Sequence, residues 1–336
     1  MAHHEITDIV LFGDCRPIHR PAIDVAKSKN VRVHVYEEGY FRPFWVTLEA
    51  GGVNGQSSLP RNAQYYLDKG CSTLDYDNGT PFRSAFWKRV AYDIGYNFWA
   101  GLNRFFHAGV PGHVPYSPLQ EYLAYAKKTI VDITSKKNKS DLTELYCEME
   151  TGASIFYLFP LQLATDSQIT HHSPFSSIED AAAKIIRSFA SYAPPDAKLL
   201  IKSHPLDPGM IDYRSKILQI AQALGVCSRV VYINGGNLPR LITFSRATVT
   251  INSTVGASSL LHGKPTKVLG SAIYDIPGLT YQGTLDSFWY TDETPNMQLF
   301  KSFRNVVINE TQVNGGFYCK TGIELAVRNS LNRLID

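Results

Sequence analysis

The stretch ATVTINSTVGASSLLHGKPTKVL, residues 247–269, decides the fold class of this chain. Its β-branched start, 247–251, predicts a short buried strand, the small and apolar residues of 255–262 predict a helix, and 266–269 predict a second strand. A strand, a helix and a strand in this order form a parallel unit, because the helix returns the chain to the start of the next strand. The stretch therefore predicts an α/β fold.

The alternation of strand and helix continues upstream of this stretch. From residue 154 onwards, short runs of β-branched and aromatic residues alternate with amphipathic helical runs. The expected strands are 154–159, 198–202 and 229–233, and the expected helices are 178–192, 213–224 and 238–244. Elements of these lengths in strict alternation predict a doubly wound, Rossmann-like domain.

The first half of the chain opens in the same way and then becomes helical. Residues 6–12 and 31–36 predict strands on either side of a helix at 21–28. The pattern is helical from 60 to 134, and the polar run SKKNKSD at 135–141 predicts a loop.

The length of 336 residues exceeds one average domain. We expect an N-terminal Rossmann-like domain with a helical insertion at 1–150 and a second Rossmann-like domain at 151–310. Residues 311–336 are expected to end in a helix that packs back on the first domain. The fold class that follows is α/β.

Composition excludes several classes of protein. A hydrophobic share of 44% suits a globular core, and a net charge of +3 does not call for a nucleic-acid partner. The five cysteines are scattered without metal-ligand or disulfide spacing, which fits a reducing compartment. There is no signal peptide and no apolar run long enough to span a bilayer, so we expect a cytoplasmic or peripheral protein.

A hydroxyl-rich turn follows the expected strand 247–251. Asn252, Ser253 and Thr254 begin a helix, where free backbone N–H groups and the positive end of the helix dipole favour a phosphate without a metal. The alternative is that Asn252 or Ser253 serves only as a helix N-cap, the commonest use of such residues. The residues alone leave both interpretations open.

Polar residues also follow two other expected strands. Lys202, His204 and Pro205 come after one, and a histidine there can donate a hydrogen bond to a departing phosphate, although a lone histidine is usually structural. Gln162 follows the other strand, with Asp166 four residues further on. Because open α/β sheets bind ligands at the carboxyl ends of their strands, these loops are candidates for one site.

An acidic pair, Glu37-Glu38, ends the expected strand 31–36. Adjacent side chains of an extended chain point to opposite sides, so one carboxylate at most faces a given site, and an exposed turn is the alternative. The run Asp75-Tyr76-Asp77 has the D-x-D form of metal-dependent nucleotide-sugar sites, but we interpret it as chance, since no clear strand precedes it. The ten histidines show no zinc-ligand spacing, so we expect no metal and no other cofactor.

Several segments, in order along the chain, resemble the KpsS-type capsule polysaccharide proteins. The segments are VYEEGYFRPFWVTLE at 35–49, SLPR at 58–61, PLQLATDSQITHHSPF at 160–175, KSHPLDPG at 202–209 and INSTVGASSLLHGKPTKVLGSAIYDIPGLTYQGTLDSFW at 251–289. The resemblance implies a β-Kdo transferase, related to the KpsC enzymes, that moves Kdo from CMP-Kdo to a phosphatidylglycerol-type lipid. It also implies a GT-B-like fold, in which two Rossmann-like domains face a cleft.

The resemblance also implies roles for individual residues. Glu37 and Glu38 would be the acidic motif with the acid/base role, and Asp166 would be the nucleophile of a retaining, double-displacement reaction. The donor CMP-sugar would be bound by the residues Gln162, Lys202, His204, Pro205, Asn252, Ser253 and Thr254. The first domain would be the acceptor side, and the expected partners are a lipid acceptor, a KpsC-like transferase and the capsule export machinery.

Two further expectations concern the first domain. Relatives begin with an extra strand, turn and helix before the element at 9–17, so this domain is expected to be shortened, and catalytic competence is then open. The aromatic and basic run 84–106 suits either a core helix or an interfacial helix at the inner face of the inner membrane. A CMP-sialic-acid-type or other GT-B transferase and a non-catalytic capsule assembly or export component remain as alternatives.

Overall fold

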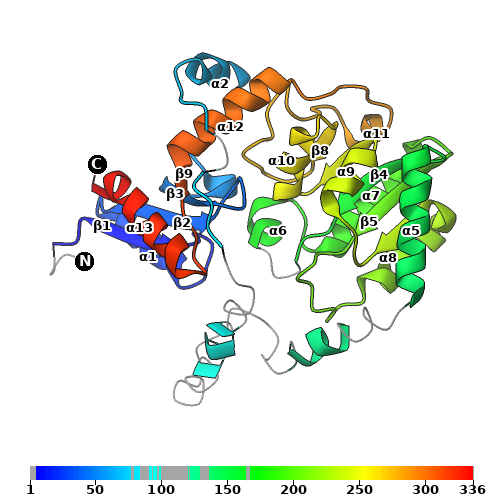
Figure 1. The fold of residues 1–336 in the computed structure, drawn as a ribbon, viewed down its shortest axis with the longest axis horizontal. Helices are drawn as coiled ribbons and strands as arrows, with labels where there is room; N and C mark the ends of the chain where they lie inside the picture. The colour runs from blue at the N-terminus through cyan, green and yellow to red at the C-terminus, as the bar shows by residue number, and fades with distance from the viewer. Residues whose placement is uncertain are drawn as a thin grey trace. The chain divides into compact units, whose positions relative to one another are not determined.

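The computed structural model describes residues 5–76, 79–83, 91–92, 94–96, 98–99, 120, 122–128, 136–163 and 167–335. These residues divide into two compact units, coloured along the chain in Figure 1. Unit 1 takes the described residues within 1–60, 64–118 and 301–336, and unit 2 takes those within 61–63 and 119–300.

Unit 2 is built on a five-stranded parallel sheet (Figure 1). Its strands are β4 (Ile155–Pro160), β5 (Ala197–Lys202), β6 (Val230–Ile233), β7 (Ala247–Thr250) and β8 (Thr266–Val268). They lie in the order β6-β5-β4-β7-β8, so the chain winds outward from β4 first in one direction and then in the other. This doubly wound arrangement confirms the α/β class predicted from the sequence.

Helices cover both faces of this sheet. One apolar cluster joins β4 and β5 to helix α7 (Ile178–Tyr192) and helix α8 (Tyr213–Ala223), and the short α11 (Leu285–Phe288) packs against α7. A second cluster joins the opposite side of the same strands to α5 (Lys136–Thr151) and α9 (Leu238–Phe244). Alternation along the strands explains both clusters, since neighbouring residues of β5 point to opposite faces.

The loop predicted at 135–141 is wrong, because α5 already begins at Lys136. Further along this helix, Leu142, Leu145, Tyr146 and Met149 recur at helical spacing and join the second apolar cluster. That buried stripe stabilises the helix, so a polar first turn does not prevent the helix from forming. Unit 2 also contains α6 (Ser167–His172), α10 (Thr254–Leu261), the 3-10 helix η3 (Cys227–Arg229) and the helical segment 122–128.

Unit 1 contains a mixed four-stranded sheet in the order β1-β2-β3-β9. The strands are β1 (Asp8–Phe12), β2 (Arg32–Glu38), β3 (Trp45–Ala50) and β9 (Gln312–Asn314). Helix α1 (His19–Ser28) connects the parallel pair β1 and β2, as the sequence predicts, whereas β3 runs antiparallel to both β2 and β9. Helix α2 (Ala63–Gly70) and the 3-10 helix η2 (Asn54–Gln56) follow β3.

The end of the chain belongs to the first sheet. Helix α12 (Met297–Thr311) leads into β9, and α13 (Lys320–Ile335) packs on the sheet through Ala326 and Leu334, alongside the blue strands in Figure 1. The sequence placed a boundary between residues 150 and 151, whereas the division into units assigns the described residues of 119–150 to unit 2 and those of 301–310 to unit 1.

The pairing of β1 with β2 includes a charge cluster that predicts a pH dependence. Asp8 accepts from Arg32 Nε at 2.7 Å and pairs with His34 Nε2 at 2.8 Å. The hydrogen bond from His34, followed by those from Thr7 and Arg32, lowers the pKa of Asp8 from 3.8 to about 2. A lowered pKa contributes stability that is present above the ordinary value and is lost as the pH falls through the folded value.

We therefore expect Asp8→Asn to lower the melting temperature above pH 4, with the wild-type and variant curves converging as the pH approaches about 2. Melting followed by circular dichroism between pH 6 and pH 2 measures the difference. Asp24→Asn, at an exposed position on α1, is the control and should follow the wild type. A constant gap between Asp8→Asn and wild type across this range would contradict the assignment.

Candidate functional site

The strand order of unit 2 has its switch point between β4 and β7, where open α/β sheets bind ligands. Gln162 follows β4, Asn252 follows β7, and the structure brings these two predicted residues together. Gln162 Nε2 donates to Asn252 Oδ1 at 3.0 Å, and Asn252 Nδ2 donates to the carbonyl oxygen of His172 at 3.0 Å. These two hydrogen bonds therefore hold together the loop after β4, the loop after β7 and the end of α6.

Ser253 is the N-cap of α10, as one of the two sequence interpretations expected. Its Oγ accepts from the backbone N–H of Val255 at 3.2 Å. Thr254, the first residue of the helix, is exposed. The N–H groups of Val255 and Gly256 already donate to Ser253, so the donors that this end of α10 can offer are those of Thr254 and the Ser253 hydroxyl, together with the positive dipole end. The cap and a phosphate site are compatible here.

A residue that sequence reasoning missed holds this turn in place. The Tyr274 hydroxyl donates to the carbonyl oxygen of Ser253, and burial raises the pKa of Tyr274, so the hydroxyl keeps its proton. The ring packs where Gly256 has no side chain, since a Cβ there would lie 2.1 Å from Tyr274 Oη. Gly256, in the stretch 247–269, is the one sequence signal that could have indicated such a close contact.

Lys202 ends β5, and the loop that follows carries His204. Ser203 fixes this loop to the end of β6, because its N–H donates to Ile233 O at 2.9 Å and its Oγ donates to Asn234 O at 3.1 Å. His204 Nδ1 accepts from the N–H of Leu206 at 3.1 Å. A neutral His204 therefore carries its proton on Nε2, which makes that atom a hydrogen-bond donor. Pro205, the next residue, is exposed.

Lys202 itself is buried, with 4% of its surface exposed. Its Nζ donates to Ser203 O at 3.2 Å. Burial first, and the charge of Lys128 second, lower the pKa of Lys202. A lysine in this environment favours a negatively charged ligand, since an anion would compensate the loss of hydration.

The acidic pair of unit 1 lies at the end of β2, and its two side chains have different partners. Glu37 Oε1 accepts from the N–H of Glu38 at 3.0 Å, and burial raises the pKa of Glu37, partly opposed by this hydrogen bond and by Arg16. Glu38 Oε1 accepts from the Tyr318 hydroxyl at 2.7 Å. The two carboxylates therefore diverge, as the alternation of an extended strand predicts.

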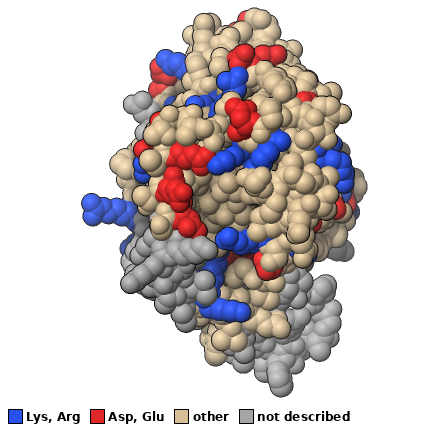
Figure 2. Space-filling view, turned by 90° about the vertical axis from the view of Figure 1, so that its right-hand side faces the viewer, with Lys and Arg blue, Asp and Glu red and all other residues tan. Residues whose placement is uncertain are grey.

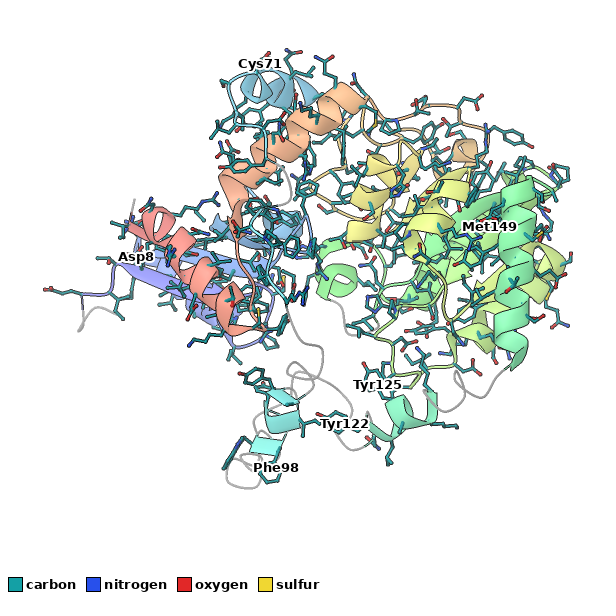
Figure 3. The ribbon with its side chains drawn as sticks, viewed as in Figure 1. Asp8, Cys71, Phe98, Tyr122, Tyr125 and Met149 are labelled. Atoms are coloured by element: carbon teal, nitrogen blue, oxygen red, sulfur yellow. The ribbon has the colours of Figure 1, made fainter. Side chains whose placement is uncertain are left out.

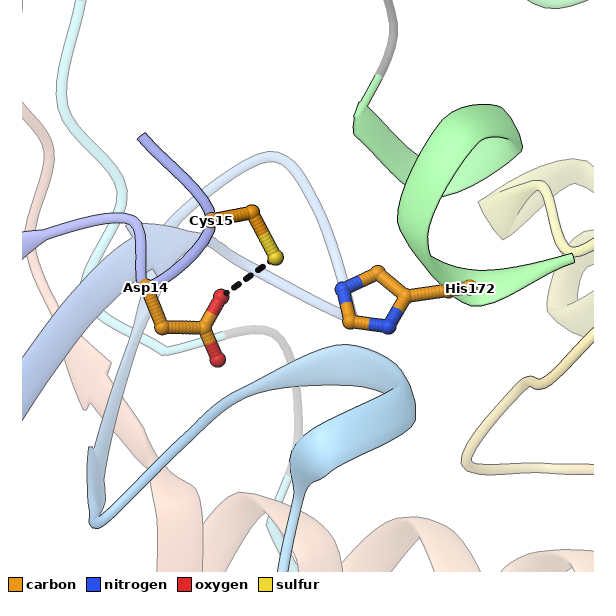
Figure 4. A group of neighbouring side chains, drawn as sticks. All are labelled: Asp14, Cys15 and His172. Carbon is orange, nitrogen blue, oxygen red and sulfur yellow. Dashed lines mark hydrogen bonds between the residues drawn. The ribbon is translucent and has the colours of Figure 1, made fainter. Parts of the chain in front are cut away.

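The turn after β1 lies beside Glu37. Gly13 adopts a φ of +75°, and a Cβ added there would lie 3.4 Å from Glu37 Oε2. The next residues, Asp14 and Cys15, are joined by a hydrogen bond from Cys15 Sγ to Asp14 Oδ1 at 3.2 Å (Figure 4). Burial, reinforced by Asp14, raises the pKa of the Cys15 thiol to about 12, which keeps it protonated. Sequence reasoning assigned no role to this turn.

Comparison with known proteins identifies the family of this chain. The family model described as "Capsule polysaccharide biosynthesis protein" matches residues 7–318. The chain belongs to the capsule polysaccharide biosynthesis protein family. It is 38% identical over 325 residues to the capsule polysaccharide export protein KpsS of Escherichia coli, covering 94% of this chain and 80% of that relative. It is 36% identical over 331 residues to the capsule polysaccharide modification protein LipB of Neisseria meningitidis serogroup A, covering 95% and 76%.

Among solved structures, the chain is similar to KpsC of Thermosulfurimonas dismutans, named as a β-Kdo 2,7-transferase. The TM-score is 0.44 with 14% sequence identity, over 90% of this chain and 77% of that one. The resemblance to KpsS-type capsule proteins that the sequence motifs indicated is thus confirmed at the level of the family.

Two predicted positions of this family member lie outside the described residues, namely Asp166 and Asp77. Asp75, the other carboxylate of the D-x-D run, is bound to α12. Its Oδ2 pairs with Lys301 Nζ at 2.7 Å, and its Oδ1 accepts from Asn305 Nδ2 at 2.7 Å. Asp75 therefore serves a structural contact between two segments of unit 1.

The distribution of charged side chains on the surface and the apolar length of the helices are relevant to what the protein can bind. On the face drawn in Figure 2, basic and acidic side chains are interspersed and do not gather into one broad patch of a single sign among the residues described there. Within the described part of the chain, no helix is long and apolar enough to cross a membrane.

Proposed function

We propose that this capsule-family protein is a glycosyltransferase of the GT-B type that moves an acidic sugar, Kdo, from CMP-Kdo to a (lyso)phosphatidylglycerol-type acceptor. The observation that supports the donor side is the arrangement at the carboxyl edge of the unit 2 sheet. Lys202 ends β5, Gln162 follows the end of the neighbouring β4, and Asn252 follows the end of β7, just before the N-terminus of α10. The proposal extends the family membership by naming a donor, an acceptor and a reaction.

In the proposed donor complex, the phosphate of the CMP-sugar lies at the N-terminus of α10. Ser253 supplies its hydroxyl, Thr254 supplies its hydroxyl and its N–H, and the helix dipole favours the negative charge. His204 donates from Nε2 to the phosphate oxygen that leaves with CMP, which stabilises the charge that develops as the glycosidic bond breaks. Lys202 adds a positive charge on the same side of the sheet.

The proposed chemistry uses two carboxylates in succession. Asp166 attacks the anomeric carbon, CMP leaves, and the acceptor hydroxyl then displaces the carboxylate, so that the configuration is retained. A carboxylate of the acidic pair takes the proton of the acceptor hydroxyl. We assign this role to Glu37, because burial raises its pKa and makes it a stronger base than an ordinary glutamate.

The first prediction of this proposal concerns the phosphate turn. Ser253→Ala with Thr254→Ala should weaken CMP binding, measured by titration calorimetry, by about tenfold, as expected for lost hydrogen bonds to a charged group. The melting temperature should fall only slightly, because loss of the cap costs about 1 kcal/mol. Ser258→Ala, further along α10, is the control. Unchanged CMP affinity in the double variant would remove this turn from the site.

The second prediction concerns the carboxylates. Asp166→Ala and Glu37→Gln should each reduce transfer from CMP-Kdo by about 10² to 10⁴ and leave CMP affinity nearly unchanged, since these groups act in the transition state. Glu38→Gln should retain more activity than Glu37→Gln, because Glu38 is bonded to Tyr318. Wild-type turnover in Asp166→Ala would eliminate the double displacement. A chelator should leave transfer intact, because one phosphate needs no bridging divalent ion.

A non-catalytic role in capsule assembly or export is the second candidate. It is favoured by the name of the relative from E. coli, an export protein. The two candidates differ in turnover. A wild-type protein that binds CMP-Kdo but releases no CMP in the presence of a phosphatidylglycerol acceptor would favour the non-catalytic role.

We also propose that the protein works at the surface of a membrane, where a lipid acceptor would be found. Within the run 84–106, most residues lie outside the described part of the chain, but Tyr92, Tyr96, Phe98 and Trp99 are described and are 62–69% exposed. Exposed aromatic rings in a run whose sequence also contains basic residues suit the headgroup region of an anionic bilayer. This exposure favours the interfacial interpretation of the run over a core helix.

Phe98→Ser with Trp99→Ser should therefore reduce co-sedimentation with phosphatidylglycerol vesicles several-fold at low salt. Tyr290→Ser, an exposed aromatic position in unit 2, is the control and should bind like the wild type. Binding that is equal in both variants, or absent from the wild type at low salt, would contradict this placement.

A further inference from the structure

Lys202 is a buried lysine that forms no ion pair with a carboxylate among the described residues. Only 4% of its surface is exposed, and its ammonium donates to the carbonyl oxygen of Ser203. An ammonium has three donors, and a buried charge without a counter-charge destabilises the folded protein. A ligand that supplies a negative charge would remove this cost.

A second lysine lies close to this site. Lys128 belongs to the helical segment 122–128, and its Nζ donates to the carbonyl oxygen of Asp207 at 2.6 Å. The hydroxyl of Tyr125, one turn earlier in the segment (Figure 3), donates to the carbonyl oxygen of Leu206 at 2.6 Å. The segment therefore binds two successive carbonyls of the loop that carries His204, although it lies about 80 residues away in the sequence.

The two ammonium groups are near enough to influence each other. After burial, the charge of Lys128 is the other cause of the lowered pKa of Lys202. Within the described residues, Lys128 also has no carboxylate in an ion pair. Two like charges repel, and no carboxylate among the described residues compensates either of them.

The position of Lys202 in β5 points its side chain to the same side of the sheet as α10. Lys202 lies two residues after Leu200 in the strand, so the two side chains point to the same face of the sheet. Leu200 packs in the cluster that includes α5, α9 and, from α10, Val255. Its register partner in β4 is Pro160, and β7, which leads to Ser253, lies on the other side of β4. The end of β4 therefore lies between the strand that carries the lysine and the strand that leads to the helix N-terminus.

We propose that Lys202 and Lys128 form a dibasic anion site that takes the phosphate of the nucleotide donor together with the N-terminus of α10. The inference rests on the proposed function, and it adds Lys128 and its segment to the donor site. The ligand class is a nucleoside monophosphate or its sugar ester. The uncharged nucleoside, which has no phosphate, should gain no binding affinity from the two lysines.

The test measures binding of CMP and of cytidine to the full chain by titration calorimetry. Lys202→Met and Lys128→Met should each lose CMP affinity by about tenfold, the loss expected for a hydrogen bond to a charged group, while cytidine affinity stays constant. Lys128→Gln keeps a donor for the Asp207 carbonyl but removes the charge, and it should lose CMP affinity as Lys128→Met does. Lys127→Met, at an exposed neighbouring position, is the control.

Stability separates an anion site from a structural lysine. Methionine retains the apolar stem of the side chain and removes the buried charge, so Lys202→Met should melt at or above the wild-type temperature in a buffer without phosphate or sulfate. A structural lysine would instead make Lys202→Met melt well below the wild type. That result, with unchanged preference for CMP over cytidine, would overturn the proposal.

A last measurement separates this inference from the proposed function. Inorganic phosphate should raise the melting temperature of the wild type more than that of Lys128→Met. If the wild type binds no CMP but keeps this phosphate effect, the donor assignment fails and the dibasic site stands. If the wild type binds CMP and both lysine variants bind it equally well, the dibasic site fails and the proposed function stands.

Discussion

The parallel pairing of β4 with both β5 and β7 is the constraint on which the donor-side unit depends. It places the carboxyl ends of three strands at one edge, although they are separated by about 40 to 90 residues in the sequence. Beyond the strands, the N–H of Leu161 still donates to Lys202 O at 2.8 Å, and Gln162 bonds to Asn252. The loops that follow are therefore brought together by the sheet before any ligand contributes.

Local signals explain which elements the sequence could predict. Helices α7 and α9 begin and end where the pattern placed them, because Ser177 and Asn237 cap them and an apolar stripe follows. The sequence patterns did not predict strands β3 and β9. β3 is buried at five of its six positions and so does not alternate, and it pairs with a three-residue strand 265 residues away. Such partners leave no trace in a local pattern.

The same distinction applies to the candidate site. Residues directly after strands, such as His204 and Asn252, can be placed at the sheet edge from the order of elements alone. Tyr274, Tyr125 and Lys128 could not, because each acts on a loop through a contact that only the folded chain creates. The strand period predicted that Glu37 and Glu38 diverge, but not that Tyr318, 280 residues further on, binds the second of them.

The two interpretations of Ser253 that the sequence left open are parts of one arrangement. Capping uses a lone pair of the hydroxyl oxygen, which accepts from Val255 N–H, and it leaves the hydroxyl hydrogen to donate. The same bond fixes the direction of the side chain, while Tyr274 holds the carbonyl of Ser253. A turn whose dipoles are oriented in advance loses little entropy when an anion binds, so the residues that stabilise α10 also prepare it for a phosphate. Burial of Lys202, which has no ion-pair partner within the part of the chain that the structure describes, lowers its pKa at the same edge, and an anion bound there would offset both this burial and the repulsion from Lys128.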